Sequence, residues 1–219
     1  MQKKTVIFDL DGTLLDTLED LAYAGNAVLT EYDFPIHSID KYKYFVGDGM
    51  RVLIERILPS GSTPEQIQDC CSAFERIYDT CWARKTMPYS GIVEMLKRLK
   101  NERVRLAVLS NKPHQFTTVC VNRFFPEEYF DLVFGQREHV KKKPDPAGAL
   151  EIAEKLNVQP SDCIYVGDTA VDMQTGKGAG MFTVGVLWGF RTLEELQANK
   201  ADLIVRNPME IVDHVISAG

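Results

Sequence analysis

Short apolar runs alternate with amphipathic stretches along most of this chain. The apolar runs have the length and composition of strands that are covered on both faces, and they lie at residues 5–8, 105–109, 132–134, 164–166 and 182–187. Apolar positions with helical spacing lie between them, at residues 92–99, 115–125, 146–156 and 172–177. This alternation predicts an α/β fold with a doubly wound parallel sheet, to which residues 203–205 would add a short edge strand.

Residues 16–87 have a different pattern, without the short apolar runs. Apolar side chains recur there at helical spacing, and the helical stretches are broken near residues 34–35, 46–49 and 59–62. We therefore expect an all-helical module inserted after the first strand. Residues 1–15 and 88–219 would then form the α/β core.

The composition is that of an ordinary globular protein. The chain has 219 residues, of which 45% are hydrophobic, and its formal net charge of −6 argues against a nucleic-acid surface or a basic membrane patch. Residues 1–4 lead directly into a strand, so no signal peptide is expected, and no apolar run approaches the roughly 18 residues of a membrane span. The 5 cysteines lack metal-ligand spacing, which favours reduced core thiols and a cytoplasmic location.

Two acidic residues stand at the end of the first apolar strand. Asp9 and Asp11 directly follow the run at residues 5–8, and Gly12 permits a tight turn after them. Charges at the end of a buried strand need a metal ion, a partner or a catalytic role. An Asx turn leaving the strand is the alternative explanation, and the matching sites downstream weigh against it.

A second acidic pair follows the strand at residues 164–166. Asp168 and Asp172 are four residues apart, which places them on one face of the helix that begins there. The helix dipole also favours acids in a first turn. An N-cap at Asp168 and a dipole-facing acid at Asp172 would therefore explain this pair alone.

Two further strands end in polar side chains. Ser110 and Asn111 follow the strand at residues 105–109, and Lys143, beside Pro144, comes after the strand at residues 132–134. Singly, such a serine is usually a helix cap and such a lysine belongs to a solvated charge run. In a parallel sheet, however, all four strand ends meet at the edge where ligands bind.

The residue types at this edge define a chemistry. Two acid pairs would repel each other strongly, so a divalent cation is implied, and oxygen ligands alone favour Mg²⁺. A carboxylate that attacks a phosphate group meets a repulsion of roughly 4 kcal/mol per charge pair at about 4 Å and an effective dielectric of about 20. A metal ion and a lysine reduce that barrier. We therefore predict that Asp9 is a nucleophile forming an aspartyl-phosphate, and that Asp11 protonates the leaving oxygen and then activates water.

Together, the four motifs resemble those of haloacid dehalogenase superfamily phosphatases, over the whole length of the chain. The resemblance implies that Asp9 is both the nucleophile and a Mg²⁺ ligand, and that Asp11 is the general acid and base, with its backbone carbonyl on the metal. It implies that Asp168 binds the metal directly and that Asp172 supports it.

The same resemblance assigns the remaining motif residues. It implies that Ser110, with Asn111 beside it, binds the transferring phosphoryl group, and that Lys143 is the lysine of the third motif. The helical module resembles the cap of the capped members, which closes over the substrate and excludes bulk water. The implied partner is a small phosphorylated metabolite.

Gly47, Gly49 and Arg51 belong to a glycine-flanked turn that opens a helix of the module. Such a backbone permits close approach to a small ligand, although an interhelical turn without ligand contact is an alternative. The stretch is similar to the cap loop of phosphoglycolate phosphatases. That similarity implies hydrolysis of 2-phosphoglycolate, with Arg51 as the contact for the substrate carboxylate, unless Arg51 is a surface helix charge.

Other classes of function remain to be weighed. Related capped enzymes act on pyrophosphate, nucleotides or sugar phosphates, and a phosphomutase similar to β-phosphoglucomutase would share the architecture. A receiver domain, which stores phosphate on aspartate, is disfavoured. In receiver domains the phosphorylated Asp follows a later strand, and they have no helical insertion after their first strand. Monomer and homodimer are both compatible with the sequence.

Overall fold

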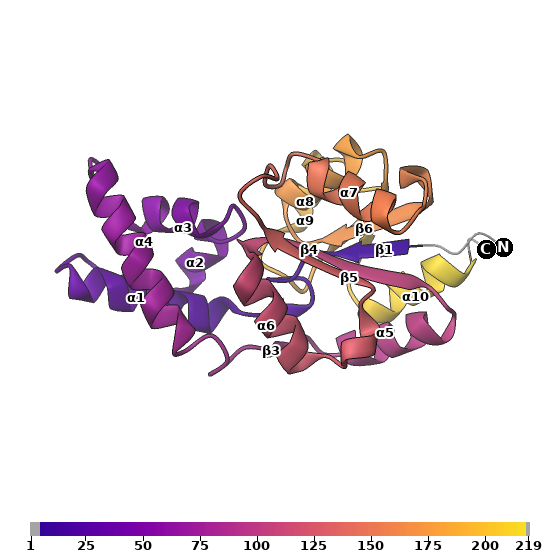
Figure 1. Cartoon of the computed structure of the whole chain (residues 1–219), viewed down its shortest axis with the longest axis horizontal. Coiled ribbons are helices and arrows are strands. Elements are labelled where there is room, and N and C mark those ends of the chain that lie inside the picture. The colour runs from indigo at the N-terminus through magenta and orange to yellow at the C-terminus, as the bar shows by residue number, and fades with distance from the viewer. Residues whose placement is uncertain (1–4, 218–219) are drawn as a thin grey trace.

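The computed structural model describes residues 5–217, which form a parallel-sheet core and a helical body beside it (Figure 1). The main sheet has the order β5-β4-β1-β6-β7-β8, and each neighbouring pair is parallel. Its strands are β1 (Thr5–Phe8), β4 (Arg105–Pro113), β5 (Leu132–Gln136), β6 (Cys163–Gly167), β7 (Phe182–Val186) and β8 (Leu203–Val205). The predicted α/β fold with a parallel sheet is confirmed, including the short edge strand β8.

Helices cover both faces of this sheet (Figure 1). Side chains alternate along a strand, so Val6 and Phe8 pack into one cluster of buried residues and Ile7 into another. The face of Val6 is covered by α5 (Ile92–Asn101), α6 (His114–Phe124) and α10 (Pro208–Ser217). The opposite face is covered by α7 (Ala147–Lys155), α8 (Ala170–Gly178) and α9 (Leu193–Ala198). Two single-turn 3₁₀ helices, η1 (Glu127–Tyr129) and η2 (Pro160–Asp162), precede β5 and β6.

The helical insertion has a hydrophobic core of its own. It consists of α1 (Leu18–Glu31), α2 (Ile39–Phe45), α3 (Met50–Ile57) and α4 (Pro64–Asp79). The longest helix, α4, begins with a capping box between Thr63 and Gln66 and with Pro64 in its first turn, where a missing N–H costs nothing. Its buried face packs on α1 around Phe74 and Tyr78.

The two chain crossings between the bodies are paired with each other. Leu15–Asp16 (β2) and Met87–Pro88 (β3) form a two-stranded antiparallel sheet, which the apolar pattern does not predict because each strand has only 2 residues. Asp20, 2% exposed, accepts hydrogen bonds from the backbone N–H groups of Lys85 and Thr86. The division of the chain at residues 16–87 stays a prediction, although these paired strands lie at its two ends.

Two other expectations can be compared with the fold. The strand expected at residues 105–109 continues to Pro113, with a register shift after Leu109, so Ser110 and Asn111 belong to the strand end itself rather than to a turn. All 5 cysteines are free and buried, as expected of core thiols. Within residues 5–217, no helix has the length and apolar character needed to cross a bilayer.

Candidate active site

Three carboxylates meet at the carboxyl ends of β1 and β6. Asp9 directly follows β1, Asp168 directly follows β6, and Asp172 lies in the first turn of α8. One oxygen from each of the three lies within 4.8 Å of the others, and all three residues are buried. The parallel register of β1 and β6 produces this arrangement, because both strands end at the same edge of the sheet.

Lys143 supplies the positive charge at this cluster. Its Nζ lies 2.9 Å from Oδ1 of Asp9 and 2.7 Å from Oδ1 of Asp172. The lysine is 3% exposed, so the three charges interact in an environment with little screening by water. One lysine among three carboxylates leaves an excess of negative charge.

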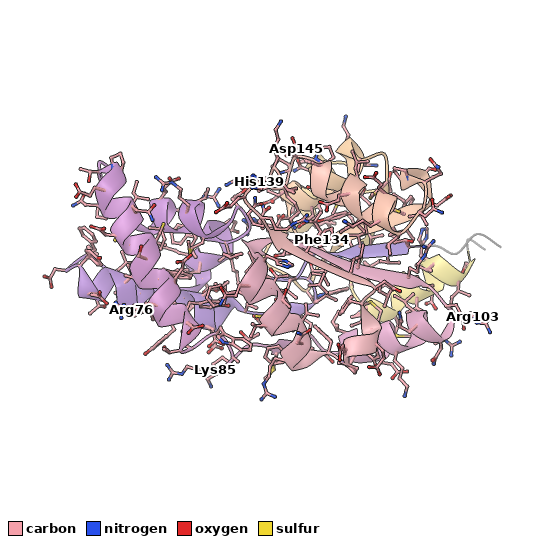
Figure 2. All side chains as sticks on the ribbon, in the orientation of Figure 1. Arg76, Lys85, Arg103, Phe134, His139 and Asp145 are labelled. Carbon is pink, nitrogen blue, oxygen red and sulfur yellow. The ribbon has the colours of Figure 1, made fainter. Side chains whose placement is uncertain are left out.

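Asn111 holds the backbone of Lys143 in place. Its Oδ1 accepts a hydrogen bond from the amide of Lys143 at 2.9 Å, and its Nδ2 donates to the carbonyl of the same residue at 3.0 Å. Nδ2 also donates to the carbonyl of Gly47 in the helical insertion, at 3.0 Å. Figure 2 shows His139 and Asp145, on the same loop as Lys143, at the end of the core that faces the insertion. Asn111 therefore positions Lys143 and links the two bodies.

Burial dominates the electrostatics of the cluster. It raises the pKa of Asp9 well above the usual range, while the charge of Lys143 opposes this rise and the other two carboxylates add to it. Burial, followed by the charge of Asp172, raises the pKa of Asp168 to about 7. Burial also acts to lower the pKa of Lys143, but Asp172 and Asp9 outweigh it, so the lysine remains an ammonium.

The donors of the cluster fit a hard divalent cation. Oδ1 of Asp9 is buried and receives no hydrogen bond within residues 5–217, although its distance to Lys143 satisfies an ion pair. The three nearest carboxylates offer only oxygen atoms, which are the ligands that Mg²⁺ and Ca²⁺ prefer. A bound cation would offset the excess negative charge and bring the pKa of Asp9 down, since an opposite charge favours the ionised form.

The two acids at β6 differ in their local partners. Asp168 accepts hydrogen bonds from Oγ1 of Thr13 at 3.1 Å and from the backbone N–H of Phe190 at 2.8 Å. Asp172 accepts from the backbone N–H and Oγ1 of Thr169, at 3.1 and 2.7 Å. Thr169 is the N-cap of α8, so the alternative that placed the cap at Asp168 is wrong. Asp172 does serve the helix start, and it contacts the cluster lysine as well.

Lys112, which the motif pattern did not single out, holds Asp11. Its Nζ lies 3.1 and 3.3 Å from the two carboxylate oxygens of Asp11 and 2.8 Å from the hydroxyl of Tyr78 on α4. Burial alone would lower the pKa of Lys112, but Asp11 and Tyr78 outweigh it and raise the pKa. The sequence pattern gives no signal for this lysine, because the apolar run ends at Leu109 and β4 continues to Pro113 only after a register shift.

A cavity of about 50 Å³ lies between the sheet edge and the insertion. Asp9, Asp11 and Ser110 line it from the core, and Gly47 and Gly49 line it from the insertion. Six apolar side chains complete most of the wall: Leu21, Val46, Met50, Leu53, Phe74 and Phe116. The structure therefore brings the loop around Gly47 and Gly49 to the same space as Asp9, Asp11 and Ser110.

The loop that contains Gly47 and Gly49 contacts the core at neighbouring points. Gly47 has a φ of 121° and Gly49 a φ of 88°, a region that favours glycine. A Cβ on Gly49 would lie 3.2 Å from the carbonyl oxygen of Asn111, and Nζ of Lys142 donates to the carbonyl of Asp48 at 2.9 Å. The two glycines thus lie close to the core backbone and line the cavity, and their approach to a ligand stays a prediction.

Arg51, which the resemblance implies as the contact for the substrate carboxylate, is not brought to the cavity, and neither is His114, the first residue of α6 after the polar end of β4. The guanidinium of Arg51 pairs with Glu55 at 3.1 Å and with Gln68 at 3.4 Å, and its side chain is 51% exposed. Nδ1 of His114 accepts a hydrogen bond from the backbone N–H of Gly135 at 3.2 Å. Neither residue lines the cavity. In this structure Arg51 is the surface helix charge that the sequence offered as the alternative.

This fold and site define a family. The family of haloacid dehalogenase-like hydrolases matches residues 6–186, and the chain belongs to it. The matched segment contains the sheet edge with its acid pairs, its serine and its lysine.

The chain is similar over nearly its full length to proteins named phosphoglycolate phosphatase. The chain is 32% identical to a phosphoglycolate phosphatase of Psychrobacter arcticus over 225 residues, covering 100% of this chain and 98% of the relative. It is also 32% identical to a phosphoglycolate phosphatase of Aquifex aeolicus, covering 95% of each chain. A solved structure from Lactobacillus delbrueckii subsp. bulgaricus aligns with a TM-score of 0.92 at 30% identity, covering 98% of this chain and 99% of that one.

Proposed function

We propose that this protein is a Mg²⁺-dependent phosphatase that hydrolyses 2-phosphoglycolate to glycolate and phosphate through an aspartyl-phosphate on Asp9. The observation that carries the chemistry is the buried Asp9 beside Lys143, in a cluster of three carboxylates at the sheet edge. The substrate assignment is supported by the full-length similarity to phosphoglycolate phosphatases.

Each residue has a role that follows from its place. Asp9 would attack phosphorus, and Asp11, which faces the same cavity, would protonate the leaving oxygen and then take a proton from the hydrolytic water. Ser110 would donate a hydrogen bond to a phosphoryl oxygen, and Lys143 would offset negative charge at the attacking carboxylate.

The metal ion would be held by Asp9, Asp168 and the backbone carbonyl of Asp11, with Asp172 in support. Bound Mg²⁺ would neutralise part of the phosphoryl charge beside the nucleophile. Lys143 contacts both Asp9 and Asp172, so it would keep these two carboxylates oriented.

The helical insertion would act as the cap. Its loop reaches the cavity, and the boundary that we propose, residues 16–87, falls at the paired strands β2 and β3. Closure of the insertion would exclude bulk water from the aspartyl-phosphate until the hydrolytic water is in place.

A substrate screen combined with trapping tests the proposal. The protein with Mg²⁺ would be assayed on 2-phosphoglycolate, pyrophosphate, a nucleotide and a sugar phosphate, and acid-quenched samples would be searched by peptide mass spectrometry for phosphate on Asp9. We expect the highest kcat/KM for 2-phosphoglycolate and a label on Asp9 alone. Asp9→Asn should abolish turnover and label.

Asp20→Asn is the matched control, because Asp20 is a buried aspartate outside the site. It should keep both the turnover and the label. A phosphorylated residue other than Asp9 would contradict the mechanism. A sugar phosphate that is rearranged rather than hydrolysed would instead indicate a phosphomutase.

A further inference from the structure

We propose that Lys112 and Tyr78 together receive the carboxylate of the substrate's leaving group, which makes the pair the element that selects a carboxylated phosphate ester. This inference rests on the proposed phosphatase function and replaces the exposed Arg51 as the carboxylate contact. Lys112 belongs to strand β4 of the core and Tyr78 to helix α4 of the insertion, and a hydrogen bond joins them.

Charge in the cavity points to Lys112. Among the residues that line the cavity, the ionisable ones at its core side are Asp9, Asp11 and Lys112, so Lys112 is the cation available to an anionic leaving group. Lys143 lies behind Asp9 and contacts two carboxylates, and it does not line this cavity. A second anionic group on the substrate, beyond the phosphate, therefore has one ammonium to meet here.

The hydrogen-bonding capacity of the pair matches two acceptor oxygens. An ammonium carries three N–H donors and a phenol one O–H donor. Within residues 5–217, Nζ of Lys112 contacts the Asp11 carboxylate and the oxygen of Tyr78. These are three contacts for three N–H groups, two of them to the same Asp11 carboxylate at 3.1 and 3.3 Å. Tyr78 accepts in its contact with Lys112, so its O–H remains for a ligand, and a ligand oxygen would take over one of the two N–H contacts to Asp11. Two neighbouring donors, one of them charged, fit a carboxylate.

The remaining wall disfavours other leaving groups. It is formed mostly by apolar side chains of the insertion, such as Leu53 and Phe74, together with Phe116 from α6. A sugar would leave several hydroxyls without partners against this wall, and each unpaired polar group is costly.

A carboxylate bound by Lys112 and Tyr78 would contact both the core and the insertion. The ring of Tyr78 stacks on Phe74 and lies edge-on to Phe116, with centroid separations of 5.4 and 5.3 Å, and Nζ of Lys112 lies 4.7 Å from its centroid. These contacts hold the hydroxyl in one place. A carboxylate bound there would contact the core and the insertion at once, next to Asp11.

Ligand binding, without turnover, tests the assignment. The Mg²⁺-loaded protein would be titrated calorimetrically with 3-phosphonopropionate, a non-hydrolysable analogue with the carboxylate, and with propylphosphonate, which lacks it. The measured quantity is the ratio of the two dissociation constants. A charge-assisted hydrogen-bonded pair corresponds to a preference of about 10- to 100-fold for the carboxylated analogue in the wild-type protein.

The variants separate recognition from structure. Lys112→Met should reduce the preference at least tenfold, Lys112→Arg should keep part of it, and Tyr78→Phe should reduce it by a smaller factor. Lys142→Met is the matched control, since Lys142 also reaches from the core to the insertion, through the carbonyl of Asp48, without lining the cavity. It should leave the ratio unchanged.

The outcomes are distinct from those of the substrate screen. An unchanged ratio in Lys112→Met, or no preference in the wild-type protein, would overturn the assignment even if the protein is a phosphatase. Conversely, a lost preference in Lys112→Met would support it even if 2-phosphoglycolate is not the best substrate. If circular dichroism shows that Lys112→Met does not fold, Tyr78→Phe and Lys112→Arg decide by the same ratio.

Discussion

Replacing Asn111 by alanine should reduce stability and activity together. The substitution removes three hydrogen bonds of 2.9 to 3.0 Å, two with the backbone of Lys143 and one with the carbonyl of Gly47. Buried groups that lose a partner cost about 1–3 kcal/mol each, with partial recovery by water, so a loss of about 2–4 kcal/mol is expected. At about 2–4 °C per kcal/mol for a chain of this size, the melting temperature should fall by roughly 5–15 °C.

The effect on activity has a separate cause. Without Asn111 the loop that carries Lys143 is less constrained, and the lysine that contacts Asp9 and Asp172 loses its orientation. Loss of a residue that orients a site residue typically costs about 10- to 100-fold in activity or metal affinity. We therefore expect kcat to fall by about that factor, measured at a temperature well below the transition.

Asn26 provides a matched control in the insertion. Its side chain also makes three hydrogen bonds: to the carbonyl of His37 at 2.8 Å, from the amide of His37 at 3.0 Å and from the hydroxyl of Tyr42 at 3.0 Å. Asn26→Ala should lower the melting temperature by a similar amount and keep kcat within about twofold. Equal losses of kcat in the two variants, or full kcat in Asn111→Ala, would refute the positioning role of Asn111.

Three further predictions concern charge. Mg²⁺ should raise the melting temperature of the wild-type protein by binding the folded state, and Asp168→Asn should lose most of that rise in a thermal shift assay; an equal rise in both would place the ion elsewhere. Without metal, the pKa of Asp168 is raised from 3.8 to about 7, so the folded state binds more protons than the unfolded state. This contribution to stability is present below about pH 4 and is lost as the pH rises to about 7. Urea unfolding of the metal-free protein should therefore give a lower free energy of unfolding at pH 7.5 than at pH 5. The difference between the two pH values should be smaller in Asp168→Asn. Arg51→Ala should leave KM for 2-phosphoglycolate unchanged, because Arg51 pairs with Glu55 on an exposed helix face; a large rise in KM would restore Arg51 as a substrate contact.

The sheet edge could be predicted from the sequence because charges at the ends of buried strands are informative. Asp9 and Asp168 each follow an apolar strand directly, and parallel strands place such residues together. Lys143 is less obvious, since it stands seven residues beyond the end of β5 at Gln136. Its position depends on Asn111, a long-range contact that no local pattern shows.

Lys112 and Arg51 lie elsewhere in the structure than their sequence patterns suggest, and each difference has a physical reason. Lys112 follows two polar residues after an apolar run, which is the usual sequence of a solvated loop, but the continuation of β4 to Pro113 buries it. Arg51 is the converse case, because it was expected to contact the substrate and its side chain lies on the surface. Glu55 stands four residues later on the same helix, and this spacing favours a surface ion pair, which is the contact that the structure contains.

The pairing of β2 with β3 makes the whole helical insertion, in topological terms, the loop of a β-hairpin. Asp16 and Met87 are cross-strand partners, so the intervening segment leaves and re-enters the core at adjacent backbone positions. Excising it and closing the two strands with an Asn-Gly turn would keep every strand of the six-stranded sheet. The shortened chain should still unfold cooperatively in calorimetry, and the absence of a transition would show that the core depends on the insertion for its stability.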